Sequence, residues 1–126
     1  MRTKKSFFGI TLGCFFSVVP MLNADSAEDF SLYQKAAKQG NANAQYNLGL
    51  MYHEGRGIAK NVAKAVAWYQ KAADKGNADA QFNLGCMYGN GEGIARDEAE
   101  AVRWFRKAAK NGSENAKQLL QEIEAK

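Results

Sequence analysis

The chain has 126 residues, a formal net charge of +4 and 46% hydrophobic residues, which suit one folded domain. Three of its 17 basic residues lie in the first five positions and all 13 acidic residues lie beyond residue 24, so residues 25–126 carry 14 − 13 = +1. This balance excludes the strongly basic surface typical of nucleic-acid binding, and we expect no nucleic-acid partner.

Residues 1–24 are typical of a secretory signal peptide. Basic residues precede an uncharged apolar run over residues 7–19, and Pro20 separates that run from a short segment ending at Ala24. The run is shorter than the roughly 18 to 20 residues of a membrane-spanning helix, so we expect cleavage after Ala24 and no membrane insertion afterwards. The alternative is lipidation at Cys14, although Thr11 stands where such sites have an aliphatic residue. The sequence thus predicts an exported protein, periplasmic or secreted.

Removal of residues 1–24 leaves Cys86 as the single cysteine, so no intramolecular disulfide is expected in the exported chain. Two interpretations of Cys86 stay open. It is either a small buried hydrophobic residue or the site of an intermolecular disulfide or reactive thiol.

Residues 25–43 are predicted to open the folded domain as a half repeat. Their segment LYQKAA, residues 32–37, matches the second part of the units that follow. A polar Asp25 or Ser26, followed by acidic residues, predicts the start of the first helix.

Two full repeats follow, at residues 44–79 and 80–115, and 19 of their 36 aligned positions are identical. The segment AQYNLGLMYHEGRGIA from Ala44 aligns with AQFNLGCMYGNGEGIA from Ala80. A duplicated structural unit explains this match. Residues 116–126 begin a third unit and are predicted to form a solvent-facing capping helix, because Gln121 replaces the repeat's glycine.

Each repeat is predicted to form two antiparallel helices. The first helix has apolar residues at helical spacing. In the first repeat these are Ala44, Leu48, Met51 and Tyr52. The second helix has two adjoining apolar stripes, which predict a broad buried side. These stripes contain Val62, Val66, Tyr69 and Ala73, and Ala65, Trp68 and Ala72.

Glycines and polar residues mark the predicted helix boundaries. Residues 55–57 and 91–93 read G-x-G between the two helices, and Gly76 and Gly112 follow the second helices, where a left-handed cap is expected. Asn61 and Asp97 are predicted N-caps, and Asp97 with Glu100 resembles a capping box.

Gly49 and Gly85 lie inside predicted helices, where glycine costs about 1 kcal/mol relative to alanine. Close approach of two helices is the expected compensation. The large side chains expected to fill the space between repeats are Trp68 and Trp104.

The period and the pattern A-Q-x-N-L-G-x-M-Y, G-x-G-I-A, A-V-x-W-[YF]-x-K-A-A and a closing glycine resemble the Sel-1-like repeat family, over residues 31–126. This family is a branch of the tetratricopeptide-like solenoids. The resemblance implies an all-α fold, a right-handed superhelix of stacked antiparallel helix pairs, with about six helices here. It also implies an exported bacterial adaptor or scaffold for protein complexes, in the envelope or at the host interface.

A cysteine-rich branch of the same family is associated with penicillin binding and weak β-lactamase activity. It supplies the alternative function, a hydrolase directed at cell-wall or β-lactam substrates. The paired cysteines of that branch are absent from this sequence.

By analogy with tetratricopeptide-like units, the first helix of each repeat lines the concave side of the solenoid. The residues predicted for this partner-binding face are Asn43, Tyr46, Leu50, His53, Glu54, Asp79, Phe82, Cys86 and Asn90. An apolar stripe of Tyr46, Leu50, Phe82 and Cys86 would suit a peptide or helix of another protein. The alternative is that these aromatic side chains pack inside the solenoid.

Catalytic and metal-binding groups are sparse. One histidine, His53, and one cysteine after cleavage give no basis for a metal cluster or a cysteine–histidine pair, and we expect no cofactor and no enzyme activity. His53 itself is expected to be solvated beside a loop. Acidic residues near Asp97 are explained by helix capping, and the G-x-G segments by turns. Self-association of so small a domain stays open.

Overall fold

The computed structural model describes residues 27–125, which form six helices and no strand. The helices are α2 (Ala27–Lys38), α3 (Ala42–Glu54), α4 (Val62–Asp74), α5 (Ala78–Asn90), α6 (Glu98–Lys110) and α7 (Glu114–Glu124). The predicted all-α fold is confirmed. The predicted signal peptide, the alternative lipidation site at Cys14 and the predicted helix start at residues 25–26 lie outside the described residues.

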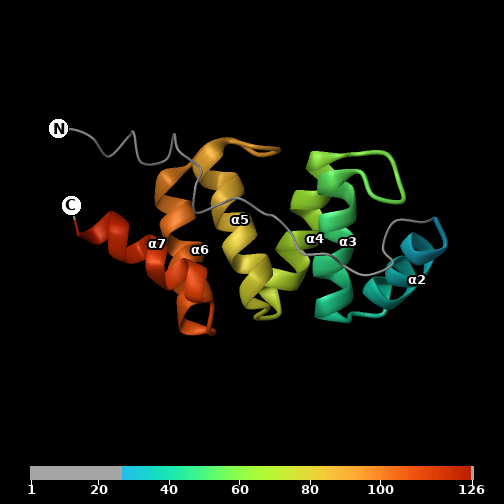
Figure 1. Ribbon diagram of the computed structural model, residues 1–126, viewed down its shortest axis with the longest axis horizontal. Helices are drawn as coiled ribbons and strands as arrows, with labels where there is room; N and C mark the ends of the chain where they lie inside the picture. Colours follow the sequence, from blue (N-terminus) through green and yellow to red (C-terminus); the bar gives the residue numbers. More distant parts are fainter. Residues whose placement is uncertain (1–26, 126) are drawn as a thin grey trace.

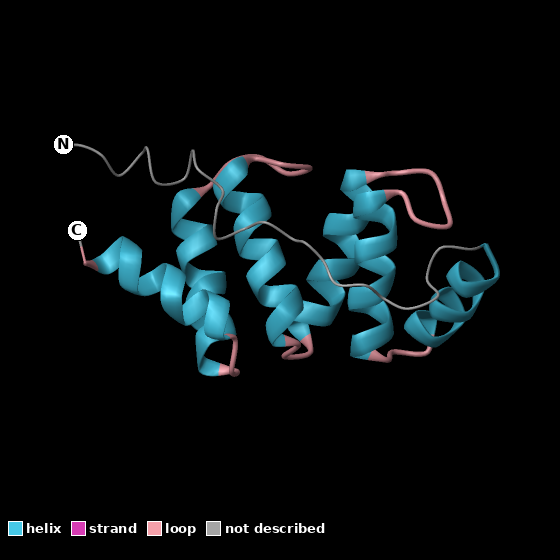
Figure 2. Ribbon diagram, in the orientation of Figure 1, coloured by secondary structure: helices cyan, strands magenta, loops and turns pink. Residues whose placement is uncertain are grey.

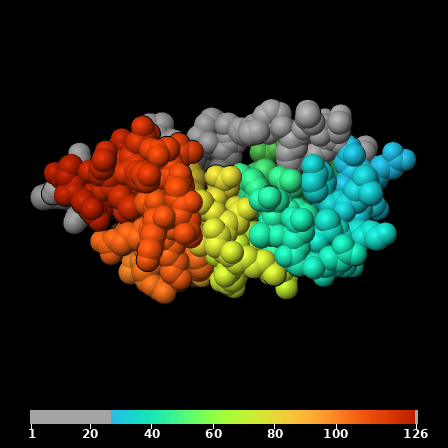
Figure 3. Space-filling model, turned by 90° about the horizontal axis from the view of Figure 1, so that it is seen from below, coloured from blue at the N-terminus to red at the C-terminus, as the bar shows by residue number. Residues whose placement is uncertain are grey.

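The helices stand side by side in chain order along the long axis of the molecule, from α2 at one end to α7 at the other (Figure 1). The two G-x-G loops lie on one edge and the three short turns lie on the opposite edge (Figure 2). The space-filling view shows the same succession as adjoining bands of side chains (Figure 3). The helices that pack against each other are neighbours in sequence, which is the arrangement of a solenoid.

None of these six helices has the length and apolar character required to cross a membrane.

Side-chain caps begin the helices where the sequence predicts them. Oδ1 of Asn61 accepts a hydrogen bond from the backbone N–H of Lys64 at 3.0 Å, and Oδ1 of Asp97 accepts one from Glu100 at 3.0 Å. The first helices of the repeats begin in the same way, at Asn41 and Asn77. These bonds satisfy backbone N–H groups that have no acceptor within the helix.

The capping box predicted at Asp97 is only half formed. The carboxylate of Glu100 does not return to the backbone of Asp97, because it accepts two hydrogen bonds from Arg103, at 2.8 and 2.9 Å. The backbone N–H of Asp97 instead donates to the carbonyl of Tyr88, at 2.9 Å. The loop therefore closes back on α5 through the main chain.

A hydrophobic interior runs through the stacked helices. The first cluster extends from Ala37 of α2 to Trp104 of α6, and the second joins α5, α6 and α7 around Phe105. The four apolar residues predicted for the first helix of repeat one are all buried. In the second helix, Val62 and Trp68 are half-buried and the rest of both predicted stripes is buried.

Gly49 and Gly85 allow the two helices of each repeat to approach closely, as predicted. A Cβ atom at Gly49 would lie 2.6 Å from ring carbons of Tyr69, and one at Gly85 would lie 2.7 Å from the ring of Phe105. Real Cβ atoms do not approach so near. The aromatic residue that follows each tryptophan therefore occupies the space that the glycine leaves.

Candidate functional site

The surface formed by the first helices of the two full repeats is here called the α3/α5 face. Its exposed residues are Asn43, Glu54, Asp79 and Asn90, and Tyr46 is half-buried. Asn43, Tyr46 and Asp79 come from the N-terminal halves of α3 and α5, whereas Glu54 and Asn90 end those helices. The accessible groups thus lie toward the two edges of the face.

A chain of hydrogen bonds orients the N-terminal edge. Oδ1 of Asn77 caps α5 by accepting from the N–H of Ala80 at 2.8 Å, and Nδ2 of Asn77 donates to Oδ1 of Asn43 at 3.0 Å. The amide of Asn43 is thereby held by the N-cap of α5. Sequence reasoning missed Asn77, although its spacing of 36 residues from Asn41 marks both as caps.

Tyr46 lies against the interior, with its ring centroid 5.9 Å from that of Tyr69. Burial, together with the negative charge of Asp79, raises the pKa of Tyr46 to about 12. The buried side chain of Asn83 lies beside the phenols of Tyr46 and Tyr69. The hydroxyl of Tyr46 therefore stays protonated at physiological pH, where it can donate or accept a hydrogen bond.

The middle of the predicted apolar stripe is interior. Leu50 and Phe82 are each 6% exposed, and the ring of Phe82 packs 5.6 Å from that of Phe105. The alternative interpretation, packing inside the solenoid, holds for these side chains. Periodicity could not distinguish the two, because helical spacing shows which residues share a side of the helix but not what covers that side.

Cys86 is 1% exposed and packs in the second hydrophobic cluster. Burial agrees with the first interpretation of Cys86, and its sulfur is disulfide-bonded, so it is not a free thiol. The expectation for the chain without residues 1–24 stays a prediction. The other cysteine of the sequence, Cys14, lies outside the described residues.

The prediction of a solvated His53 is wrong, because this side chain is only 8% exposed. Its Nε2 lies 3.0 Å from Oε2 of Glu92, and its Nδ1 lies 3.5 Å from the hydroxyl of Tyr69. Glu92 belongs to the G-x-G loop of the second repeat, which reaches back over the first. Adjacent repeats are thus connected by polar contacts that sequence spacing alone did not reveal.

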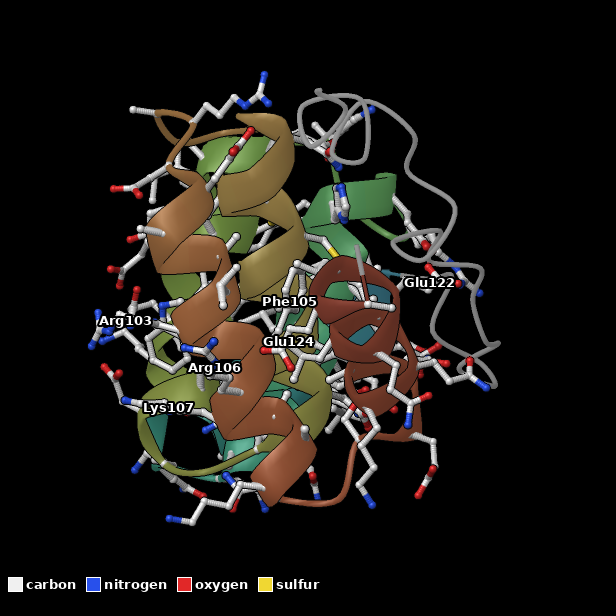
Figure 4. The ribbon with its side chains drawn as sticks, turned by 90° about the vertical axis from the view of Figure 1, so that its left-hand side faces the viewer. Arg103, Phe105, Arg106, Lys107, Glu122 and Glu124 are labelled. Carbon is white, nitrogen blue, oxygen red and sulfur yellow. The ribbon has the colours of Figure 1, made fainter. Side chains whose placement is uncertain are left out.

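Basic residues avoid the α3/α5 face. Neither α3 nor α5 contains lysine or arginine, whereas each of the second helices contains at least two. In the view onto the α7 end, Arg103 and Lys107 point outward from α6 and Phe105 points inward (Figure 4). Arg106 instead lies next to Glu124, with Nη2 3.1 Å from Oε2.

No group of three or more histidine, cysteine or acidic residues among residues 27–125 is arranged to hold a metal ion.

Matches to curated proteins are short. One 42-residue stretch, 33% of this chain, is 48% identical to DAP3-binding cell death enhancer 1 of Rattus norvegicus, and it spans 8% of that protein. Another 42-residue stretch, 32% of the chain, is 45% identical to an ERAD-associated E3 ubiquitin-protein ligase component, HRD3A, of Arabidopsis thaliana, and it spans 6% of that protein. The chain thus spans less than a tenth of either relative.

Matches to solved structures cover most of the chain. A Sel1 repeat protein from Oxalobacter formigenes has a TM-score of 0.70 and 43% identity, over 71% of this chain and 37% of that one. A protective antigen present in uropathogenic Escherichia coli strains has a TM-score of 0.74 and 37% identity, over 95% and 25% of the two chains. Cysteine rich protein B of Helicobacter pylori has a TM-score of 0.71 and 32% identity, over 73% and 69%.

The model of the Sel1 repeat matches three times, at residues 30–41, 42–77 and 78–113. The two complete matches have the period of 36 residues found by internal alignment, and they begin two residues earlier, at the start of α3 and of α5. With repeats over most of its length and the fold of solved Sel1 repeat proteins, the chain belongs to the Sel1 repeat family.

Proposed function

We propose that the chain is a protein–protein interaction module whose α3/α5 face binds a segment of another protein. The observation that carries this proposal is the N-terminal edge of that face. There, Asn43 and Asp79 are exposed beside the half-buried phenol of Tyr46. Amide, carboxylate and phenol groups held on rigid helices can bind main-chain and side-chain groups of a polypeptide.

Two relatives support a role in protein complexes. One is described as a DAP3-binding protein, and another as a component of an E3 ubiquitin-protein ligase. Each matches this chain over only 42 residues, about the length of one repeat. We infer that this chain uses its repeats in the same general way, with a partner of its own.

Site-specific photo-crosslinking tests the binding face. A benzophenone amino acid at Asn43 or Asp79 should crosslink one partner in the producing cell, whereas the same group at Lys71, on the second helix, should not. With the partner purified, calorimetry should give weaker binding to the Tyr46→Ala variant than to Lys71→Ala. Equal affinity of both variants, at unchanged helicity, would remove the α3/α5 face from the proposal.

We also propose that the protein acts outside the cytoplasm, because residues 1–24 have the sequence of a signal peptide. Mass spectrometry of the protein from the periplasmic fraction and the medium should find chains that begin at Asp25. A lipid-modified chain beginning at Cys14 would support the alternative, and a cytoplasmic chain retaining Met1 would contradict export.

No hydrolase is proposed, since no specific observation on the described residues favours one.

A further inference from the structure

Unlike the other carboxylates near the α3/α5 face, Asp79 has no basic side chain paired with it among the described residues. Glu54 is paired with Arg56 at 3.1 Å, and Glu92 contacts His53 at 3.0 Å. Asp79 is exposed in the first turn of α5 and forms no ion pair with any residue between 27 and 125. Its charge is thus open to a ligand from outside.

The groups around Asp79 suit a positively charged side chain. The hydrogen bond between Asn77 and Asn43 holds the first turn of α5, which contains Asp79, beside the N-terminal half of α3, which contains Tyr46. An aromatic ring attracts a cation to its face. Neither α3 nor α5 contains a lysine or arginine, and Lys75, in the turn before α5, holds its Nζ beside Gly40, in the turn before α3. The edge therefore has the charge and the ring that lysine and arginine recognition uses.

An exposed amide beside these groups, that of Asn43, can bind the main chain of the same ligand. Asn43 is fixed by the hydrogen bond that its Oδ1 accepts from Asn77, so its Nδ2 group remains as a donor for a carbonyl. Asn83, which is 4% exposed, lies beside the phenol of Tyr46.

We propose that the N-terminal ends of α3 and α5 recognise a lysine or arginine of the partner protein, with the cation between Asp79 and Tyr46 and the adjoining main chain at Asn43. This inference rests on the proposed function and names the chemistry of the partner segment. A neutral or acidic segment would leave Asp79 without an opposite charge, and an acidic one would be repelled.

Selection from a displayed library of random 12-residue peptides tests this inference, with the full chain as the target. Enriched peptides should contain more lysine and arginine than the unselected library. Synthetic copies of the best peptides should bind the Asp79→Asn variant roughly tenfold more weakly, which is the usual effect of losing a charge-assisted hydrogen bond. The Asp79→Lys variant should prefer the same peptides with their basic residue changed to glutamate.

Asp74→Asn is the matched control, because Asp74 is an exposed carboxylate on α4 that accepts from Gln70 at 2.9 Å. It should bind the selected peptides as the natural chain does. Peptides without an excess of basic residues that nevertheless lose affinity in the Tyr46→Ala variant would overturn this inference and leave the proposed function standing. Failure to enrich any peptide sensitive to Asn43, Tyr46 or Asp79 would overturn both.

Discussion

Equivalent residues of the two repeats do not form the same number of hydrogen bonds, and Gln45 and Gln81 give the clearest case. Nε2 of Gln45 donates to the carbonyl of Ala37, and Nε2 of Gln81 donates to that of Ala73, each at 3.0 Å and each to the preceding helix. Oε1 of Gln81 also accepts from Asn111 at 3.0 Å, whereas Oε1 of Gln45 is buried without a donor among the described residues. The residue that corresponds to Asn111 in the first repeat is Lys75.

Replacing Lys75 by asparagine should supply this missing hydrogen bond. Lys75 and Asn111 have nearly the same backbone conformation, with φ −91° and −93°, so the new amide can point as Asn111 does. We expect stabilisation by about 0.5–1.5 kcal/mol in urea unfolding. Lys71→Asn, a similar change away from Gln45, is the control and should not stabilise the chain.

Tyr46 gives the fold a dependence on alkaline pH. Its folded-state pKa of about 12 lies above the ordinary value of 10.0, so the folded chain retains this proton more strongly than the unfolded chain. The resulting stability is fully present below pH 10 and is lost as the pH rises toward 12. A difference of about two pKa units between the folded and unfolded chain corresponds to roughly 2–3 kcal/mol of the free energy of unfolding.

The Tyr46→Phe variant should therefore lose less stability than the natural chain between pH 9 and pH 11.5, measured by denaturant midpoints. Burial also raises the pKa of Tyr69 well above its ordinary value, so some alkaline loss should remain. Identical pH profiles of the two chains would contradict the assignment to Tyr46.

Among the elements, the pairing of α3 with α4 and of α5 with α6 depends on one glycine each. Gly→Ala in an exposed helix usually stabilises by about 1 kcal/mol. At Gly85 the sign should reverse, because the added methyl group would meet the ring of Phe105 at 2.7 Å and backbone O of Ala101 at 3.2 Å. Overpacking of this kind costs about 1–3 kcal/mol.

We therefore expect Gly85→Ala to lower the free energy of unfolding and the melting temperature. In a Phe105→Leu background the same change should cost less, since the ring is then absent. A penalty that is equal in both backgrounds would show that the methyl group conflicts with the backbone instead.

Features of the helices that depend on neighbouring residues could be predicted from the sequence, and features that depend on distant residues could not. Helix ends followed from Asn61, Asp97 and Gly76, because capping is decided by residues within one turn. The state of His53 did not follow, because it depends on a loop 39 residues away. Phe82 was ambiguous, since helical spacing shows which residues share a side of the helix but not that Phe105 of the paired helix covers that side.

At the scale of the whole molecule, the repeats are joined by the contact between His53 and Glu92. A double-mutant cycle with His53→Gln and Glu92→Gln should give a coupling energy of about 1.5 kcal/mol, the low end for a hydrogen bond to a charged group, because the Glu92 side chain is 41% exposed. Pairing Arg56→Gln with Glu92→Gln gives the comparison cycle on the same loops. A coupling energy of zero for His53 and Glu92 would mean that the apolar interior alone holds the two repeats in register.

Each helix packs on its neighbours along the chain. This arrangement also affects how the molecule folds. Contacts that are short in sequence close small loops, so little entropy is lost before each one is made, and such topologies fold quickly. A hairpin leaving the ribosome already has its packing partner beside it. Synthesis and folding of this protein can therefore proceed in the same direction, one repeat after another.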